Sequence, residues 1–188
     1  MANQERDPYT RFSPHPQKRE IAYHAAGHAV VSMRLGGSVT RIELCDADDD
    51  NPDRWVLIRG NGFEEGEYLE KATSSLIGPI VECLASNGEN HPRDVEPLER
   101  ICQFLFEHQE AAGITEDLQD AWMELSVVCD LDLLDDRQLG ERLAAWQWLT
   151  IRTYRIAVEN WEDIEGVTEE LLAHGIVSYQ RLKEIVPS

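Results

Sequence analysis

Two histidines four residues apart give the sequence its clearest chemical signal. His24 and His28 lie in the string YHAAGH, within a stretch (residues 18–35) whose pattern predicts a helix. Side chains at this spacing project from one side of a helix, one turn apart, so both imidazoles can bind one metal ion. In the zinc motif H-E-x-x-H, the glutamate after the first histidine acts on the metal-bound water as a general base. Here that position is Ala25, which can neither accept a proton nor orient a water.

Spacing alone leaves other interpretations open. Among sequences of this length with six histidines, roughly one in six has a pair four apart by chance. The two histidines can also be surface residues or hydrogen-bonded core residues of a helical domain without a metal. Gly27 favours a site, because a glycine inside a helix costs about 1 kcal/mol relative to alanine. Its use there predicts close approach by another segment.

A longer string around these histidines resembles a known family. Residues 21–31, IAYHAAGHAVV, resemble the zinc-binding helix of FtsH-type proteases, the peptidase domain of the membrane AAA proteases, which reads A-Y-H-E-A-G-H-A-V-V. The departure falls on the catalytic glutamate, at Ala25. The resemblance implies a Zn²⁺ cofactor bound by His24 and His28. Ala25 is then either an introduced inactivating substitution or a natural loss.

Two later segments resemble the same family in the same order. Residues 77–82, IGPIVE, resemble its G-G-R-A-A-E-E helix, and residues 94–101, DVEPLERI, resemble its N-D-L-E-R-A-T helix, whose aspartate is the third zinc ligand. The resemblance implies this role for Asp94, and a carboxylate is favoured near the start of a helix. Asp94 can also be a simple helix cap. The rival ligands are His91, beside a proline in a predicted loop, and Glu82, which by the resemblance supports the site rather than binding the metal.

The pattern of the chain predicts a mainly α fold with a small β element. Residues 39–44 and 54–59 read as strands of a β-hairpin or of the edge of a small sheet. Glycines at 36 and 37 predict the end of the first helix. Helical patterns follow over residues 65–85, 93–112, from 115 onward, 161–173 and 178–185. We expect a polar leader at residues 1–17 and one peptidase-like domain at residues 18–188, with the resemblance covering residues 19–185.

Composition limits the classes of partner. The formal net charge of −19 argues against nucleic acid and against anionic lipid surfaces, both of which need a basic face. The sequence contains neither a long apolar run for a membrane span nor the apolar core of a signal peptide. Four cysteines lack C-x-x-C spacing, which predicts reduced, buried thiols rather than disulfides or zinc ligands. A cytoplasmic location is the expectation that follows.

These observations predict a zinc metalloendopeptidase-like protein, in which zinc-activated water would hydrolyse a peptide bond. Ala25 makes it inactive or impaired as written. The alternative is a non-catalytic, zinc-stabilised adaptor that binds peptides. The expected partner is a polypeptide substrate or peptide ligand, paired as an added strand with residues 39–44 or 54–59. These 188 residues contain no nucleotide-binding G-x-x-x-x-G-K-[ST] motif, so a separate ATPase partner or a homo-oligomer is a further expectation.

Overall fold

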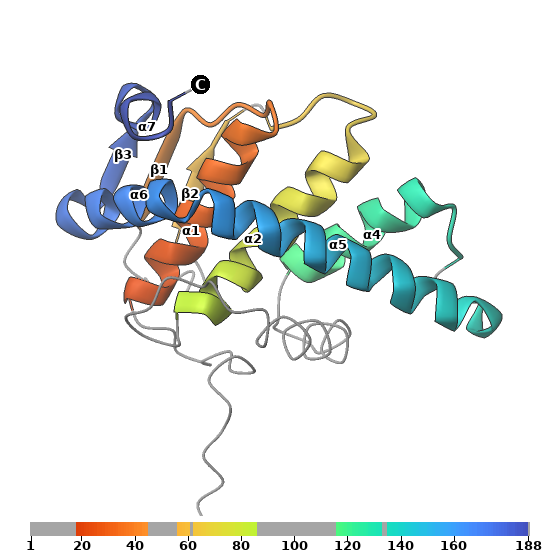
Figure 1. Ribbon diagram of the computed structural model, residues 1–188. Helices are drawn as coiled ribbons and strands as arrows, with labels where there is room; N and C mark the ends of the chain where they lie inside the picture. The colour runs from red at the N-terminus through yellow and green to blue at the C-terminus, as the bar shows by residue number, and fades with distance from the viewer. Residues whose placement is uncertain (1–17, 45–55, 61, 86–115, 133–134, 188) are drawn as a thin grey trace, which may run out of the picture.

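The chain is mainly helical with one small antiparallel sheet, as its sequence predicts (Figure 1). The computed structural model describes residues 18–44, 56–60, 62–85, 116–132 and 135–187. The polar leader at 1–17 and the helix expected over 93–112 lie outside these ranges.

Five α-helices build the body of the described structure. The helices α1 (Lys18–Arg34) and α2 (Tyr68–Ala85) pack on each other, and α4 (Glu116–Cys129) packs on α2. A short 3-10 turn, Asp136–Gln138, leads into α5 (Leu139–Glu159). Figure 1 shows α5 passing across α2 and α6 passing across α1. The α6 helix spans Trp161–His174.

Small residues let α1 and α2 approach closely. The buried face of α1 is rich in alanine, whereas α2 contributes larger apolar side chains such as Leu76 and Ile80. A methyl group added at Gly27 would lie 3.0 Å from Cγ2 of Val81, which is tighter than ordinary van der Waals contact. The close approach predicted from this glycine is therefore confirmed.

Glycines end two of the helices. Gly36 follows α1 with a φ of +91°, in the left-handed region that glycine adopts easily, which confirms the predicted stop. Gly175 ends α6 with a φ of +71° and donates its backbone N–H to the Leu171 carbonyl.

The sheet contains the predicted pair of strands and a third strand that the sequence did not predict. Strand β1 (Arg41–Leu44) pairs antiparallel with β2 (Val56–Arg59). On its other edge β1 pairs with β3 (Ile176–Ser178), which is followed by α7 (Tyr179–Ile185). The helical interpretation of residues 178–185 was therefore wrong at its first residue, because Ser178 is extended and its hydroxyl accepts from the Arg181 N–H as the N-cap of α7.

The central place of β1 corrects one expectation about peptide binding. Arg41, Ile42 and Glu43 are each paired on both sides, in the strand order β2-β1-β3. A peptide therefore cannot add to the sheet alongside residues 41–43, which excludes the 39–44 segment as the pairing edge. The strand at 54–59 corresponds to β2, which lies at an edge of the described sheet.

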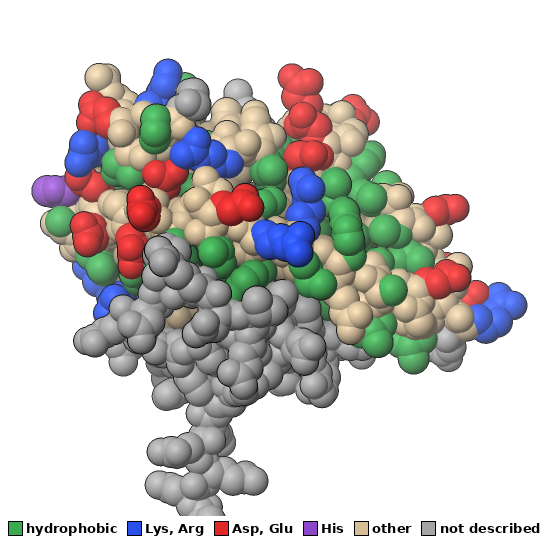
Figure 2. Space-filling view, in the orientation of Figure 1, with side chains coloured by type: hydrophobic (Ala, Val, Ile, Leu, Met, Phe, Trp, Pro, Cys, Tyr) green, Lys and Arg blue, Asp and Glu red, His purple; other side chains and the backbone are tan. Residues whose placement is uncertain are grey.

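The surface carries an apolar region over α5 and α4, where hydrophobic side chains gather in Figure 2. The exposed large apolar side chains of these two helices are Met123, Val127, Val128, Leu139, Leu143, Trp148 and Ile151. No helix in the described ranges is long and apolar enough to cross a membrane. Of the two cysteines described, Cys83 is a buried free thiol, as expected, and Cys129 is a free thiol exposed at the end of α4, contrary to expectation.

Candidate metal centre

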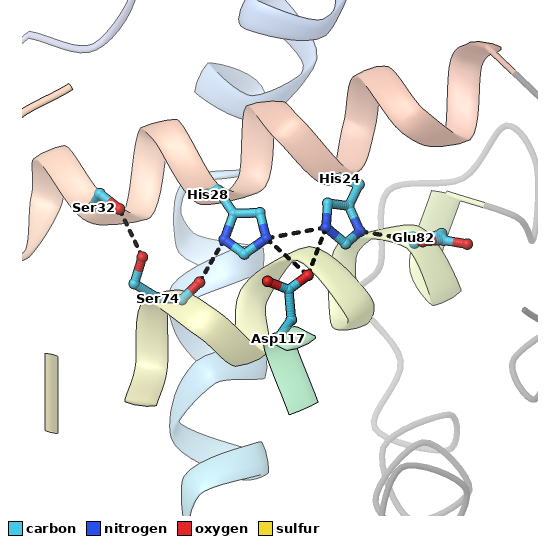
Figure 3. A network of polar contacts seen from close by, with 6 residues as sticks. All are labelled: His24, His28, Ser32, Ser74, Glu82 and Asp117. Atoms are coloured by element: carbon cyan, nitrogen blue, oxygen red, sulfur yellow. Dashed lines mark hydrogen bonds and ion pairs between the residues drawn. The ribbon is translucent and has the colours of Figure 1, made fainter. Parts of the chain in front are cut away.

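Helix α1 presents His24 and His28 on the face that meets α2 and α4 (Figure 3). The Nε2 atoms of the two rings are 3.0 Å apart, and the ring centroids are 4.8 Å apart. Their side chains are 21% and 13% exposed, so the pair is largely but not completely shielded from solvent. The convergence of these two imidazoles is what their spacing predicts.

Helix α4 adds a carboxylate to this pair. Asp117 lies in the first turn of α4, and its Oδ2 atom is 3.0 Å from His24 Nε2 and 3.5 Å from His28 Nε2. Among the described residues, His24, His28 and Asp117 form the group whose side-chain atoms are close enough to share a metal ion. These ligands come from two segments of the chain, 93 residues apart.

Acceptor groups on helix α2 orient both rings through their Nδ1 atoms. His24 Nδ1 lies 3.2 Å from Glu82 Oε2, and His28 Nδ1 donates to the Ser74 carbonyl oxygen at 2.7 Å (Figure 3). A carbonyl or a carboxylate can only accept, so each Nδ1 carries a hydrogen and each neutral ring presents a lone pair at Nε2. Metal-binding histidines are held in this way by an acceptor on the far nitrogen. The hydroxyl groups of Ser32 and Ser74 are hydrogen-bonded at 2.7 Å beside this contact.

The centre consequently concentrates acceptors and needs a cation. Two Nε2 lone pairs and one carboxylate oxygen repel one another at these distances unless a proton or a metal ion lies between them. Without a metal, burial disfavours the charged form of His24, but hydrogen bonds and charges from Asp117 and Glu82 outweigh it and raise its pKa to about 9. Burial likewise opposes ionisation of Asp117, yet the two histidines outweigh it and hold the pKa of this carboxyl well below its usual value.

The geometry of the three converging atoms fits zinc. They form a triangle with sides of 3.0, 3.0 and 3.5 Å. Separations of this size suit three atoms that bind one zinc ion, because zinc bonds to imidazole nitrogen and carboxylate oxygen are about 2.0–2.1 Å long. Three protein ligands also leave a fourth tetrahedral position open, as in catalytic rather than structural zinc sites.

The residue at the general-base position is enclosed. Ala25 follows His24 in α1, and none of its surface is exposed. A methyl group there provides no acid or base.

The residues expected at the site are only partly within the described ranges. His24, His28 and Glu82 come together, with Glu82 placed against His24 as a supporting group would be. Asp94 and His91 lie outside the described residues, so the prediction of Asp94 as a ligand stays a prediction. His174 is exposed and paired with Glu170 on the surface, as expected for a histidine outside the site.

Sequence reasoning missed Asp117. Its signal was present, because Leu118 and Leu125 predict an amphipathic helix that begins just before them. An acidic residue in a first helical turn is common, however, and Asp94 offers the same signal. Only the packing of α4 on α2 places Asp117 opposite the histidines.

Comparison with known protein families finds no model that matches this chain, and no curated protein matches it either.

Proposed function

We propose that the chain binds zinc in a site of the metallopeptidase type, through His24, His28 and Asp117. The observation that carries the proposal is the convergence of three side-chain atoms of metal-binding type, with each imidazole oriented through its far nitrogen. Glu82 and the Ser74 carbonyl hold the rings so that both Nε2 lone pairs point to one place. The resemblance of residues 21–31 to a zinc-protease helix agrees with this assignment.

The residues present account for binding and orientation but not for proton transfer. Zinc bound there would polarise a peptide carbonyl and lower the pKa of a bound water. His24, His28 and Asp117 would leave one position open for that water or carbonyl, and the exposed side of the centre gives access to it. Ala25 cannot take a proton from the water. The chain as written is therefore a metallopeptidase-like protein with impaired or absent hydrolysis.

Zinc content tests the site directly. We expect about one zinc per chain in the purified protein after dialysis against a weak chelator, measured by elemental analysis. His24→Ala and Asp117→Asn should both lose the metal, whereas His174→Ala, which changes an exposed histidine, should retain it. Zinc in the His24→Ala protein at the wild-type level would refute the site.

The third ligand needs its own comparison. We expect Asp117→Ala to weaken zinc binding by an order of magnitude or more, and Asp94→Ala and His91→Ala to change it little. Competition with a chromophoric chelator measures the three affinities on one scale. A large loss of zinc affinity in Asp94→Ala, with unchanged affinity in Asp117→Ala, would identify Asp94 as the third ligand instead.

A non-catalytic zinc protein is the second candidate, favoured by the complete burial of Ala25. Restoring the base separates the two functions. A positioned general base contributes about 10²–10⁴-fold to the rate, so Ala25→Glu should gain peptide hydrolysis by that factor if only the base is missing. Ala25→Gln is the matched control, because it has nearly the same size and cannot act as a base. A folded, zinc-loaded Ala25→Glu protein that cleaves no unstructured polypeptide would favour the adaptor, with β2 as a candidate peptide-pairing edge.

A further inference from the structure

Gly78 is the point where the backbone of α2 comes closest to the two imidazoles. A methyl group built on its Cα would lie 2.3 Å from His28 Nε2 and 2.5 Å from His24 Nε2. Real Cβ atoms essentially never come within 3.0 Å of another heavy atom. Any side chain at this position must therefore move both rings, or the two helices, away from their present places.

The contact at Gly78 differs from that at the neighbouring close glycine. A methyl at Gly27 would meet the aliphatic side chain of Val81, and the conflict there is one of ordinary packing. A methyl at Gly78 would meet the nitrogen atoms whose lone pairs face the carboxylate of Asp117. The space that Gly78 leaves free thus belongs to the metal centre itself.

Beside this space, α2 contains two residues that destabilise a helix. Gly78 and Pro79 stand together in the interior of α2, where glycine costs about 1 kcal/mol relative to alanine and proline removes a helical hydrogen bond. Gly78 does not need glycine for its backbone angles, because it is not among the residues with positive φ. Two steric reasons favour a glycine there: a Cβ on the residue before Pro79 would crowd the proline ring in a helical backbone, and it would meet the imidazole pair.

We propose that Gly78 is a positioning residue of the metal centre, and that its missing side chain lets both Nε2 atoms face one cation between α1 and α2. The proposal rests on the proposed zinc site. The new element is that the backbone of α2 at Gly78 leaves the space for the metal, whereas α1 and α4 provide the ligands. Filling this space should weaken metal binding while every proposed ligand is still present.

The test is Gly78→Ala, with Gly140→Ala as the matched control. Gly140 lies in α5, and a methyl there would meet no atom within 4 Å. We expect Gly78→Ala to lower zinc affinity at least ~10-fold and to change or abolish the visible absorption spectrum of bound Co²⁺, which reports ligand geometry. Gly140→Ala should leave both unchanged. Wild-type zinc affinity and an unchanged Co²⁺ spectrum in folded Gly78→Ala would overturn the proposal.

A double-mutant cycle in metal-free protein covers the case in which Gly78→Ala does not fold. If the methyl conflicts with the imidazoles, removing both rings should relieve it. We therefore expect Gly78→Ala to destabilise the native protein but not the His24→Ala/His28→Ala background, measured by urea unfolding. An equal loss in both backgrounds would refute the role of Gly78.

The same experiments separate the inference from the proposed function. Absence of zinc from the wild-type protein would refute the metal site, and the role of Gly78 in it as well. Zinc in the wild type, together with wild-type zinc affinity and an unchanged Co²⁺ spectrum in Gly78→Ala, would refute only the role of Gly78.

Discussion

At the scale of single residues, a proton and a metal ion compete for the same place. In metal-free protein the pKa of His24 is raised to about 9, so near neutral pH this ring is protonated and binding a metal must release a proton. We expect zinc affinity to rise about tenfold per pH unit up to about pH 9 and then to level off. Competition titrations at several pH values measure the slope, and proton release by calorimetry in two buffers checks it. Affinity that is flat between pH 6.5 and 8.5 would contradict a protonated His24.

The same pKa shifts predict how the metal-free protein responds to pH. The pKa of His24 is higher in the folded state, so its contribution to stability is complete below about 6.5 and is lost as the pH rises through about 9. The pKa of Asp117 is lower in the folded state, so its contribution is present above its ordinary value of 3.8 and is lost as the pH falls. We expect metal-free protein to lose thermal stability between pH 7 and 10. The loss should be smaller in His24→Ala, because this variant lacks the group whose pKa is raised in the folded state.

Glu82 gives a third prediction at this scale. Its carboxylate accepts from His24 Nδ1 and so fixes the ring without touching the metal position. Removing such an outer partner typically costs 10–100-fold in metal affinity. We expect Glu82→Ala to fall in this range and Glu82→Gln, whose amide oxygen can still accept, to lose less. Equal affinities in all three proteins would show that Glu82 does not orient the ring.

Among the residues of the site, the two histidines of one helix were predictable from their spacing, and Glu82 was expected beside them only by the resemblance, whereas Asp117 was not predicted. His24 and His28 follow from the period of the helix alone. Asp117 reaches them across 93 residues, and its first-turn position looks in sequence like that of Asp94. The acceptor at Ser74 is its backbone carbonyl, which every residue type has, so the sequence gives no signal for this contact. Sequence therefore predicted the pair of imidazoles and the missing base, and packing supplied the carboxylate and the acceptor.

At the scale of elements, the position of α1 decides the position of the site. The ring of Tyr23, next to His24, stacks on the buried Trp161 of α6 with centroids 5.5 Å apart. Arg34, the last residue of α1, is paired with Asp163 of α6. The α6 helix thus contacts α1 both beside His24 and at its C-terminal residue.

This arrangement predicts unequal effects for two tryptophans. Trp161 is 4% exposed, and truncating a buried tryptophan typically costs about 3–5 kcal/mol. We expect Trp161→Ala to lose about that much stability in urea unfolding and to weaken zinc binding, because α1 loses its support. Trp148, which is 47% exposed, is the control, and Trp148→Ala should cost much less. A similar cost for both would mean that the Tyr23–Trp161 contact contributes little.

The elements were predictable where local pattern dominates. The α1 and α2 helices and the β1–β2 pair follow from periodicity. Strand β3 is three residues long and exists because Ile176, Val177 and Ser178 meet β1 after the turn at Gly175. So short a segment carries no period of its own, and only its partner strand makes it extended. The position of β1 between two strands was unpredictable for the same reason.

At the scale of the whole molecule, the candidate metal centre joins three helices that are separated in the sequence. Two of the three proposed ligands belong to α1 and one belongs to α4, and α2 supplies Glu82 and the Ser74 carbonyl. Metal-free protein keeps these contacts only through hydrogen bonds and a shared proton. A bound ion would add bonds that exist in the folded state alone, so it should stabilise the whole domain.

Metal removal therefore tests the architecture as well as the site. At a free zinc concentration 100 times the dissociation constant, binding stabilises the folded state by about 2.7 kcal/mol. For a chain of this size each kcal/mol shifts the melting temperature by roughly 2–4 °C, so we expect a rise of about 5–11 °C on adding zinc to chelator-treated protein. Calorimetry with stepwise zinc measures the shift. The His24→Ala/His28→Ala protein should melt at one temperature with or without zinc, because it lacks two of the three ligands. A zinc-dependent shift that persists in this variant would place the stabilising metal elsewhere in the chain.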